Sequence, residues 1–305
     1  MNKKKILVTC PRIDESKSKF IKYFQNNEFD YQFLYPESQQ FSESEMIKLF
    51  ENVNVAIVGD DIVSENVISS SNDLEYIIKW GSGTDNINRK TAELKNIRIF
   101  NTPNILGKYV AEYGLGMLID LIKNISKTDR QVRNKNWQKN ENFTLFNSKI
   151  GFFGFGDVAN EFAKLLTPFS PSISYCDVVE KECNYKRLSF EKLLINNEIV
   201  IVTSNLTADN KEVFDKSAFQ KMGRDSYLIN ISRGGLINEE DLVVALNNLY
   251  INGAALDVYK EEPLPKDSEL RIIDNVLLGT HNASNVSTAN IEVNEYILNL
   301  MGEIL

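Results

Sequence analysis

The stretch SKIGFFGFGDVANEFAKLLTPFSPSISYCD, residues 148–177, decides the fold. It opens with a short apolar run, Lys149–Phe153, which is typical of a buried strand. A glycine-rich turn follows, and the apolar spacing after it predicts a helix over Asp157–Leu166. A second apolar run, Ser172–Cys176, reads as another strand. The stretch therefore predicts a β–α–β unit of a parallel sheet.

The turn has the form G-x-G-x-x-A, which suits the pyrophosphate of a dinucleotide. Gly154 permits the tight turn, and Gly156 lets the backbone approach the phosphates. Ala159 supplies the small residue that close packing of helix and strand requires. The free N–H groups at the start of the helix favour an anion. A structural turn without a ligand is the alternative, which the surrounding strand–helix–strand pattern disfavours.

Asp177 stands at the end of the second strand, where an acid can accept hydrogen bonds from the ribose hydroxyls of NAD. Val178 and Val179 follow it, and neither can hold the extra phosphate of NADP. We therefore expect NAD to be the cofactor.

Asp157, directly after Gly156, does not fit this site easily. A carboxylate there starts a helix well but repels a pyrophosphate. We expect its side chain to point away from the phosphates, so that backbone groups bind the cofactor.

Composition limits the remaining possibilities. The 305 residues suffice for two domains, and 43% hydrophobic with 25% charged residues is typical of a soluble globular protein. The formal charge of −8 argues against nucleic acid or an anionic membrane as the partner, and no apolar run is long enough to predict a transmembrane helix. The three cysteines form no C-x-x-C pair, so no metal site is expected, and a reducing compartment such as the cytoplasm is.

Both halves of the chain alternate strands and helices. Five strands are expected before residue 101, in an order that resembles a flavodoxin-like domain, and six from residue 149 onward, which form a doubly wound dinucleotide-binding (Rossmann) domain. An apolar helix over Lys108–Lys127 is expected to link the domains or to pack in a dimer, and Asn134–Asn147 to be a loop. The last helix, Ser287–Leu305, is expected to pack on the first domain. We predict a first domain of residues 1–101 plus 284–305 and a second of residues 102–283.

Three side chains point to acid–base chemistry. His281 is the sole histidine, and histidine exchanges protons near neutral pH. Arg233 and Glu262, like His281, lie in loops that follow predicted strands. Carboxyl ends of parallel strands meet at one edge of the sheet, so these loops should converge. Each residue alone has an ordinary structural explanation, but the three together favour a catalytic site.

Several motifs, taken together, resemble those of the D-isomer-specific 2-hydroxyacid dehydrogenases, along nearly the whole chain. The motifs are GSGTDNIN (81–88), NTPN and VAEYGLGMLI (101–104 and 110–119), IGFFGFGDVA (150–159), NISRGGLINEEDL (230–242), AALDVYKEEPL (254–264) and NVLLGTHNAS (275–284). The resemblance implies NAD(P)-dependent reduction of a 2-keto acid, or the reverse, in a cleft between two domains of a homodimer. It implies a substrate domain followed by an NAD-binding domain.

Matching the family motifs residue by residue gives each site residue an expected role. His281 would be the acid/base, Glu262 its partner, and Arg233 the substrate binder. The backbone at Ser82 and Gly83 would hold the substrate carboxylate. The expected cofactor-binding residues are Gly154, Phe155, Gly156, Asp157, Val158, Asp177, Ser204, Asn205, Asn210, Ile231, Ser232 and Asp257, the last at the nicotinamide.

Other interpretations remain open at this point. A non-catalytic protein that senses NAD(H) would use the same fold, although it would not need Arg233, Glu262 and His281. A serine hydrolase is a weaker alternative, since the chain has no G-x-S-x-G motif. Lys79 and Lys108 can bind an anionic group of the substrate, but solvated lysines are the more ordinary interpretation.

Overall fold

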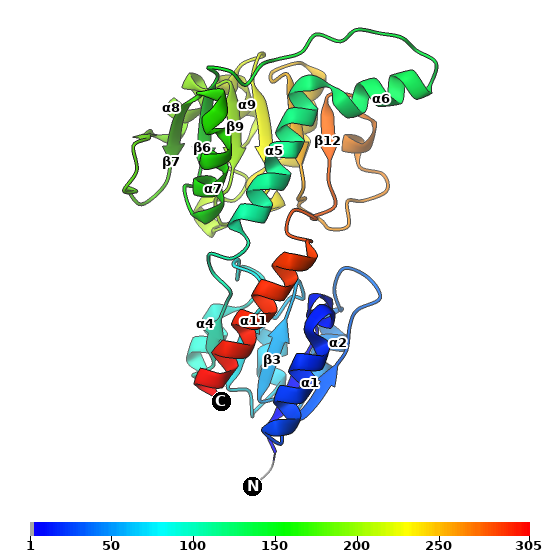
Figure 1. Cartoon of the computed structure of the whole chain (residues 1–305), viewed down its shortest axis with the longest axis vertical. Coiled ribbons are helices and arrows are strands. Elements are labelled where there is room, and N and C mark those ends of the chain that lie inside the picture. Colours follow the sequence, from blue (N-terminus) through cyan, green and yellow to red (C-terminus); the bar gives the residue numbers. More distant parts are fainter. Residues whose placement is uncertain (1–2) are drawn as a thin grey trace. The chain divides into compact units, whose positions relative to one another are not determined.

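The computed structural model describes residues 3–305 (Figure 1). Internal contacts divide the chain into two compact units. Unit 1 comprises Met1–Leu106 and Asn285–Leu305, and unit 2 comprises Gly107–Ser284. The sequence placed these boundaries at 101/102 and 283/284.

Unit 1 contains a parallel sheet of five strands in the order β2-β1-β3-β4-β5. The sequence predicted all five, with ends that differ by at most two residues. The central strand β3 is buried at each of its four residues, as expected for a parallel sheet covered on both faces. The strands are β1 (Lys5–Val8), β2 (Asp30–Phe33), β3 (Val55–Val58), β4 (Tyr76–Lys79) and β5 (Arg98–Phe100).

The helices of unit 1 begin at polar caps. A capping box of Ser42 and Glu45 starts α2. Two short helices that were not predicted, α3 and α4, begin at Ser64 and Asn88, whose side chains accept hydrogen bonds from backbone N–H groups. The helices are η1 (Pro11–Ser16), α1 (Lys17–Asn26), α2 (Glu43–Leu49), α3 (Glu65–Ser70), α4 (Arg89–Leu94) and α11 (Ser287–Ile304).

The C-terminal helix α11 belongs to unit 1, as predicted. Asn294 on this helix accepts a hydrogen bond from Nε1 of the buried Trp80 at 2.9 Å and donates one to the backbone oxygen of Arg12 at 3.0 Å. The end of the chain therefore stabilises the segments that follow β1 and β4.

Unit 2 contains a parallel sheet of seven strands in the order β12-β11-β10-β9-β6-β7-β8. Six were predicted; β8 was missed because it is two residues long and both are exposed, which leaves no hydrophobic pattern. The strands are β6 (Lys149–Phe153), β7 (Ser172–Cys176), β8 (Lys186–Arg187), β9 (Ile199–Val202), β10 (Tyr227–Asn230), β11 (Gly253–Leu256) and β12 (Val276–Leu278).

The predicted helix over Lys108–Lys127 is wrong in one respect, because it is two helices. Asn124 adopts a left-handed backbone with φ of 51°, which ends α5 (Gly107–Lys123) and precedes α6 (Ile125–Arg133). Helix α6 buries none of its residues, and the segment after it is irregular, as predicted for Asn134–Asn147. The other helices of unit 2 are α7 (Asp157–Leu166), η2 (Thr167–Phe169), α8 (Phe190–Asn196), η3 (Ala208–Asn210), α9 (Lys216–Met222), η4 (Gly234–Leu236), α10 (Glu239–Asn247) and η5 (Glu269–Ile272).

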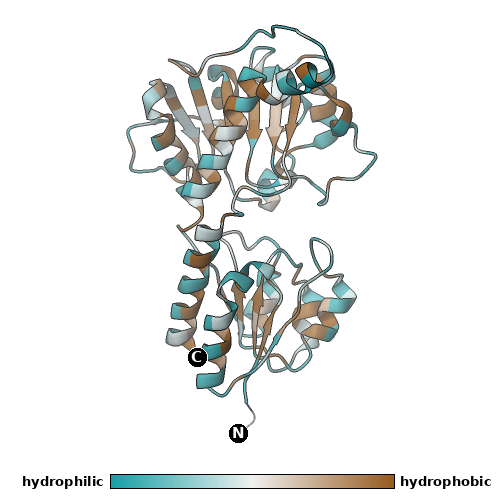
Figure 2. Cartoon of the chain, turned by 45° about the vertical axis from the view of Figure 1, so that its right-hand side comes forward, coloured by the Kyte–Doolittle hydropathy of each residue, from teal (hydrophilic) through white to brown (hydrophobic). Residues whose placement is uncertain are grey.

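Apolar side chains cover both faces of the unit 2 sheet. One core cluster includes residues of α8, α9 and α10, and the other includes residues of α5 and α7. Figure 2 shows the strands of both units as mostly hydrophobic and the outer helix faces as mostly hydrophilic. The sheets are thus buried, and the polar groups that can bind a ligand or react lie in the loops at the strand ends.

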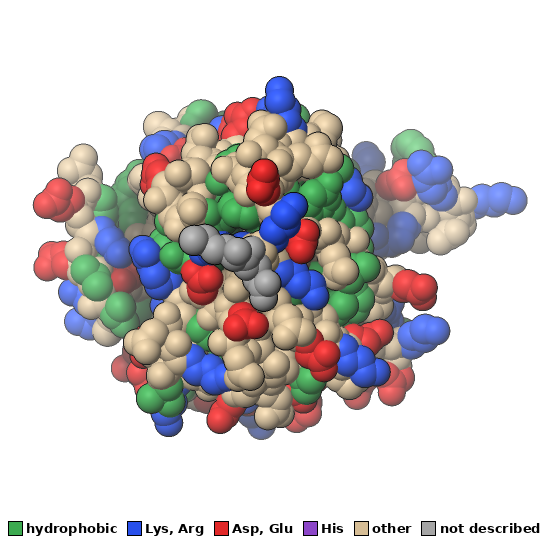
Figure 3. All heavy atoms as spheres, turned by 90° about the horizontal axis from the view of Figure 1, so that it is seen from below, with side chains coloured by type: hydrophobic (Ala, Val, Ile, Leu, Met, Phe, Trp, Pro, Cys, Tyr) green, Lys and Arg blue, Asp and Glu red, His purple; other side chains and the backbone are tan. Residues whose placement is uncertain are grey.

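On the face shown in Figure 3, acidic and basic side chains are interspersed around apolar ones rather than gathered by sign. Within residues 3–305, we find no helix with the length and hydrophobicity to cross a membrane.

Candidate functional site

The glycine turn after β6 is tightly packed on one side and open on the other. Gly154 has φ of +86°, and a Cβ there would lie 2.6 Å from backbone atoms of Ser204. A Cβ at Gly156 would meet nothing within 4 Å. Gly156 also precedes α7 without any side chain that caps the helix. The first N–H groups of α7 are therefore left for another acceptor, as a pyrophosphate-binding turn requires.

Asp177, at the end of β7, is held against this turn. Its Oδ2 accepts a hydrogen bond from the N–H of Phe155 at 2.8 Å, and its Oδ1 accepts one from Val179 at 2.9 Å. Burial acts to raise the pKa of this carboxyl, but the two backbone hydrogen bonds and Lys181 outweigh it, so the pKa lies below its ordinary value. Asp177 is thus an ionised acceptor beside the turn.

Arg187 is a residue of this region that the sequence did not reveal. It lies on β8, and its guanidinium donates hydrogen bonds to the backbone oxygens of Asp177, at 2.8 and 3.1 Å, and of Val178, at 3.0 Å. The residues that follow Asp177 in the sequence, Val178 and Val179, give no sign of this arginine. Arg187 is ten residues after Asp177, and the pairing of β8 with β7 brings it to this loop.

The carboxylate of Asp157 packs against Gly107, the first residue of α5. A Cβ built at Gly107 would lie 2.0 Å from Oδ2 and 2.5 Å from Cγ of Asp157. The side chain of Asp157 therefore occupies the start of α5, beside the start of its own helix α7. Its neighbour Val158 packs against the core cluster formed by α5 and α7.

The remaining residues expected at the cofactor lie in loops after β9 and β10. Nδ2 of Asn210 donates to the backbone oxygen of Asn205 at 2.8 Å and to Oγ of Ser204 at 3.4 Å, which fixes the loop over Gly154. Ile231 is buried against Gly114 of α5, and Oγ of Ser232 donates to Asn230 at 3.0 Å. These loops lie at the carboxyl edge of the sheet, together with the glycine turn and Asp177.

His281 and Glu262 form a direct pair. Nδ1 of His281 lies 2.6 Å from Oε2 of Glu262, and the two side chains are 29% and 22% exposed, so a reactant can reach them. The other carboxylate oxygen of Glu262 accepts a hydrogen bond from the N–H of Tyr259 at 2.9 Å. The carboxylate is therefore fixed from both sides, and it orients the imidazole.

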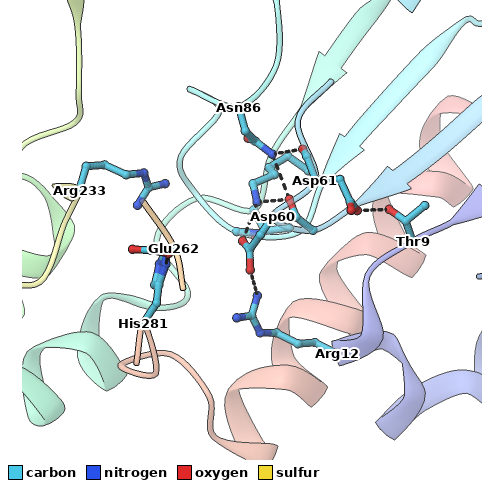
Figure 4. A network of polar contacts seen from close by, with 12 residues as sticks. Thr9, Arg12, Asp60, Asp61, Asn86, Arg233, Glu262 and His281 are labelled. Atoms are coloured by element: carbon cyan, nitrogen blue, oxygen red, sulfur yellow. Dashed lines mark hydrogen bonds and ion pairs between the residues drawn. The ribbon is translucent and has the colours of Figure 1, made fainter. Parts of the chain in front are cut away.

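Arg233 follows β10 at the same edge. Its Nη1 donates to the backbone oxygen of Ser232 at 2.8 Å. Figure 4 shows its guanidinium extending toward the side of unit 2 that carries Glu262 and His281. The structure thus brings together the three residues that the sequence selected from loops after β10, β11 and β12.

Asp257 is buried beneath the segment that carries His281. Its Oδ1 and Oδ2 accept hydrogen bonds from the N–H groups of Asn282 and Ala283, each at 3.0 Å, and its backbone oxygen accepts one from the N–H of His281 at 2.7 Å. Burial raises the pKa of this carboxyl above its ordinary value. The resemblance assigned Asp257 to the nicotinamide, but the contacts found here are with the His281 segment.

In unit 1, Ser82 and Gly83 lie in the turn after β4. Oγ1 of Thr102 accepts a hydrogen bond from the N–H of Gly81 at 2.9 Å, and Nδ2 of Asn101 donates to the backbone oxygen of Ser82 at 2.7 Å. The turn is thus fixed by the segment after β5, while Ser82 itself is exposed.

The two lysines considered as anion ligands differ. Lys108 is exposed, with its ammonium 4.8 Å from the ring centre of Tyr109. Lys79 is 4% exposed, so the expectation of a solvated lysine is wrong. Its ammonium donates to the backbone oxygen of Gly59 and lies 3.5 Å from Oδ1 of Asp60, whose Oδ2 lies 3.4 Å from Arg12 (Figure 4). Lys79 therefore stabilises the loop after β3.

Residues 115–283 match the family model of the D-isomer specific 2-hydroxyacid dehydrogenase, NAD binding domain. The chain belongs to this family. It is an NAD-dependent 2-hydroxyacid dehydrogenase, with a nicotinamide dinucleotide as cofactor. The resemblance drawn from the sequence motifs is confirmed.

Curated relatives of this dehydrogenase include reductases of small acids. A glyoxylate/hydroxypyruvate reductase A of Arabidopsis thaliana is 30% identical over 93% of this chain and 91% of its own. A glyoxylate reductase of Thermofilum pendens is 32% identical over 73% of this chain and 70% of its own.

Solved structures agree in fold with the two parallel-sheet α/β units. The NAD-dependent formate dehydrogenase of Staphylococcus aureus, in complex with NAD, superposes with a TM-score of 0.87 at 22% identity, over 98% of this chain and 95% of its own. An acyclic imino acid reductase in complex with NADPH and D-Arg gives a TM-score of 0.85 at 22% identity, over 96% and 94% of the two chains. The predicted fold class is confirmed, and the fold alone does not specify a substrate.

Proposed function

We propose that the enzyme reduces a small 2-keto acid to the D-2-hydroxy acid with NADH, or catalyses the reverse reaction. The observation that carries this proposal is the pair of His281 and Glu262, 2.6 Å apart at the carboxyl edge of the unit 2 sheet. A protein that only sensed NAD(H) would not need a fixed histidine–carboxylate pair, and none of the comparisons supports that alternative.

In the proposed reaction His281 donates the proton to the carbonyl oxygen of the substrate. Glu262 binds at Nδ1, which leaves Nε2 for the substrate and stabilises the charged imidazolium. Arg233 binds the carboxylate and the keto oxygen with its planar guanidinium, which also offsets the negative charge that develops during reduction. The nicotinamide supplies the hydride.

The residues present fit a dinucleotide. The open space above Gly156 and the uncapped start of α7 suit a pyrophosphate, and the ionised Asp177 suits a ribose diol. We infer that NAD is preferred to NADP, because the carboxylate of Asp177 repels a 2′-phosphate. Binding would involve Gly154, Phe155, Gly156, Asp157, Val158, Asp177, Ser204, Asn205, Asn210, Ile231, Ser232 and Asp257, with Asp157 taking part through its backbone only.

Unit 1 is the proposed substrate unit and unit 2 the NAD-binding unit. The exposed turn at Ser82 and Gly83 has backbone N–H groups that suit a carboxylate, and it is braced by Asn101 and Thr102. The printed names of the relatives suggest glyoxylate and hydroxypyruvate as the first substrates to test.

A homodimer is the proposed assembly. Helix α6 and the segment after it expose Ile125, Val132 and Trp137, the last at 84%, which is unusual for a monomer surface and suits a second copy. The cytoplasm is the proposed location, since all three cysteines are free thiols.

The deciding experiment measures NADH oxidation with a panel of 2-keto acids, for the native enzyme and for His281→Ala. We expect turnover with at least one acid, and a loss of about 10²–10⁴-fold in kcat in the variant with the Kd for NADH unchanged. NADH binding without turnover on any acid would instead support the sensing protein. Equal turnover in both proteins would remove His281 from the mechanism.

A further inference from the structure

The unusual residue of the cofactor turn is Asp157, which is an acid at the first position of α7. Its carboxylate leans over Gly107, at the first residue of α5. Among residues 3–305, no hydrogen bond or ion pair neutralises it. Instead it lies beside the starts of two helices, α5 and α7, whose free N–H groups attract an anion.

The same field is what the glycine turn offers to a pyrophosphate. The N–H groups at the start of α7 have no side-chain cap, and the space above Gly156 is open. A phosphate bound there would share the positive end of α7 with the carboxylate that follows Gly156 directly. Because like charges repel, the carboxylate of Asp157 weakens the binding of a phosphate at the same helix start.

We propose that Asp157 weakens the binding of the nicotinamide dinucleotide. The inference rests on the proposed role of the Gly154–Gly156 turn and adds to it. Asp157 acts through charge alone and does not contact the reacting atoms. Gly107 is required for this arrangement, since only a residue without Cβ lets the carboxylate of Asp157 lie away from the turn.

The arrangement predicts how substitutions of Asp157 and of Gly107 change the affinity for NADH. Removal of the charge by Asp157→Asn, which keeps the shape, should tighten NADH binding roughly three- to tenfold at low salt. The gain should shrink at about 0.5 M salt, because ions screen such a charge. Gly107→Ala should displace the carboxylate, and the free room lies above Gly156, so NADH should bind more weakly.

The experiment titrates NADH into the native enzyme, Asp157→Asn and the control Glu161→Gln by calorimetry, at low and high salt. Glu161 lies one turn further along α7, where it pairs with Lys164, so its variant removes the same charge at a greater distance from the turn. Adenosine, measured by competition, serves as a ligand without phosphate. We expect tighter NADH binding in Asp157→Asn only, with the affinity for adenosine unchanged.

A double-mutant cycle then tests the link between the two residues. Gly107→Ala should weaken NADH binding in the native background and have no effect in the Asp157→Ala background, where the clash is gone. Thermal melting of every variant verifies that each one folds.

Three results would overturn the proposal: an unchanged or higher Kd for NADH in Asp157→Asn, an equal gain for adenosine, or an equal gain in Glu161→Gln. Failure of the proposed function looks different. In that case NADH would bind neither the native enzyme nor any variant, or would bind a Gly156→Val protein as well as it binds the native one.

Discussion

Oδ2 of the buried Asp257 accepts a hydrogen bond from the N–H of Ala283 at 3.0 Å, two residues after His281. Together with the bonds to the N–H groups of Asn282 and His281, this ties the His281 segment to the end of β11. His281 itself has φ of +53°, a left-handed backbone that few non-glycine residues adopt, and the hydrogen bonds of its segment to Asp257 help to hold it there. Asp257 is therefore a positioning residue for His281.

Replacement of Asp257 by Asn should disturb this segment. An amide offers one oxygen where the carboxylate accepts from two N–H groups, so one buried donor loses its acceptor, at a cost of about 1–3 kcal/mol in the free energy of unfolding. We expect kcat to fall more than the affinity for NADH. Unfolding curves and steady-state kinetics measure both, and Asp225→Asn, at an exposed turn position, is the control. Native kcat in Asp257→Asn would contradict the positioning role.

The contact between Glu262 and His281 predicts that a substitution of Glu262 lowers kcat without changing the affinity for NADH. Glu262→Gln keeps the shape but removes the charge that orients and stabilises the imidazolium. We expect kcat to fall by about 10²–10⁴-fold, as for loss of general acid–base catalysis, with the Kd for NADH within error of native. The neighbouring and exposed Glu261→Gln should behave as the native enzyme. Equal losses in the two variants would point to a general effect of charge.

Arg187 should matter for the adenosine end of the cofactor. Its hydrogen bonds to the backbone oxygens of Asp177 and Val178 fix the loop that presents the acid. Because the guanidinium is exposed, Arg187→Met should raise the Kd for NADH only about three- to tenfold. Lys186→Met on the same strand is the control. An unchanged Kd would show that the loop holds its shape without Arg187.

The depressed pKa of Asp177 makes a prediction about acid stability. A carboxyl with a lower pKa in the folded than in the unfolded state stabilises the fold above the ordinary pKa of 3.8, and this contribution is lost as pH falls through the folded value. The native protein should therefore be more stable than Asp177→Asn at pH 6, and the difference should shrink below pH 3.8. Urea unfolding at pH 6 and pH 3 tests this. A difference that grows toward pH 3 would contradict the sign.

The two glycines of the turn should respond differently to alanine. At Gly154, with φ of +86° and Ser204 backbone 2.6 Å from the added Cβ, alanine should lower the melting temperature clearly. At Gly156 the added methyl meets open space, so the fold should persist while NADH binding weakens. Thermal melting and NADH titration of both variants separate the effects. A stable Gly154→Ala protein would show that the loop after β9 can move aside.

Much of the fold followed from local patterns. Strands β6 and β7 and helix α7 begin and end at the predicted residues, because buried apolar runs and helical spacing are visible in the sequence itself. The pattern could not show β8, which has no buried residue, or the break at Asn124, which depends on one left-handed backbone. Lys79 likewise looked like a surface lysine in the sequence, and only the contacts of its ammonium with Gly59 and Asp60 explain its burial.

The glycine turn, its acid, and the residues Arg233, Glu262 and His281 were determined by the sequence, since each lies in a recognisable motif after a strand. Only the tertiary structure decided how they are held. Asp257 binds the His281 segment from 24 to 26 residues away, Arg187 reaches Asp177 through strand pairing, and Asp157 rests on Gly107, 50 residues earlier in the chain. Such contacts join residues that are distant in the sequence and that the folded sheet brings together. A local pattern of residues does not show which distant segments will meet.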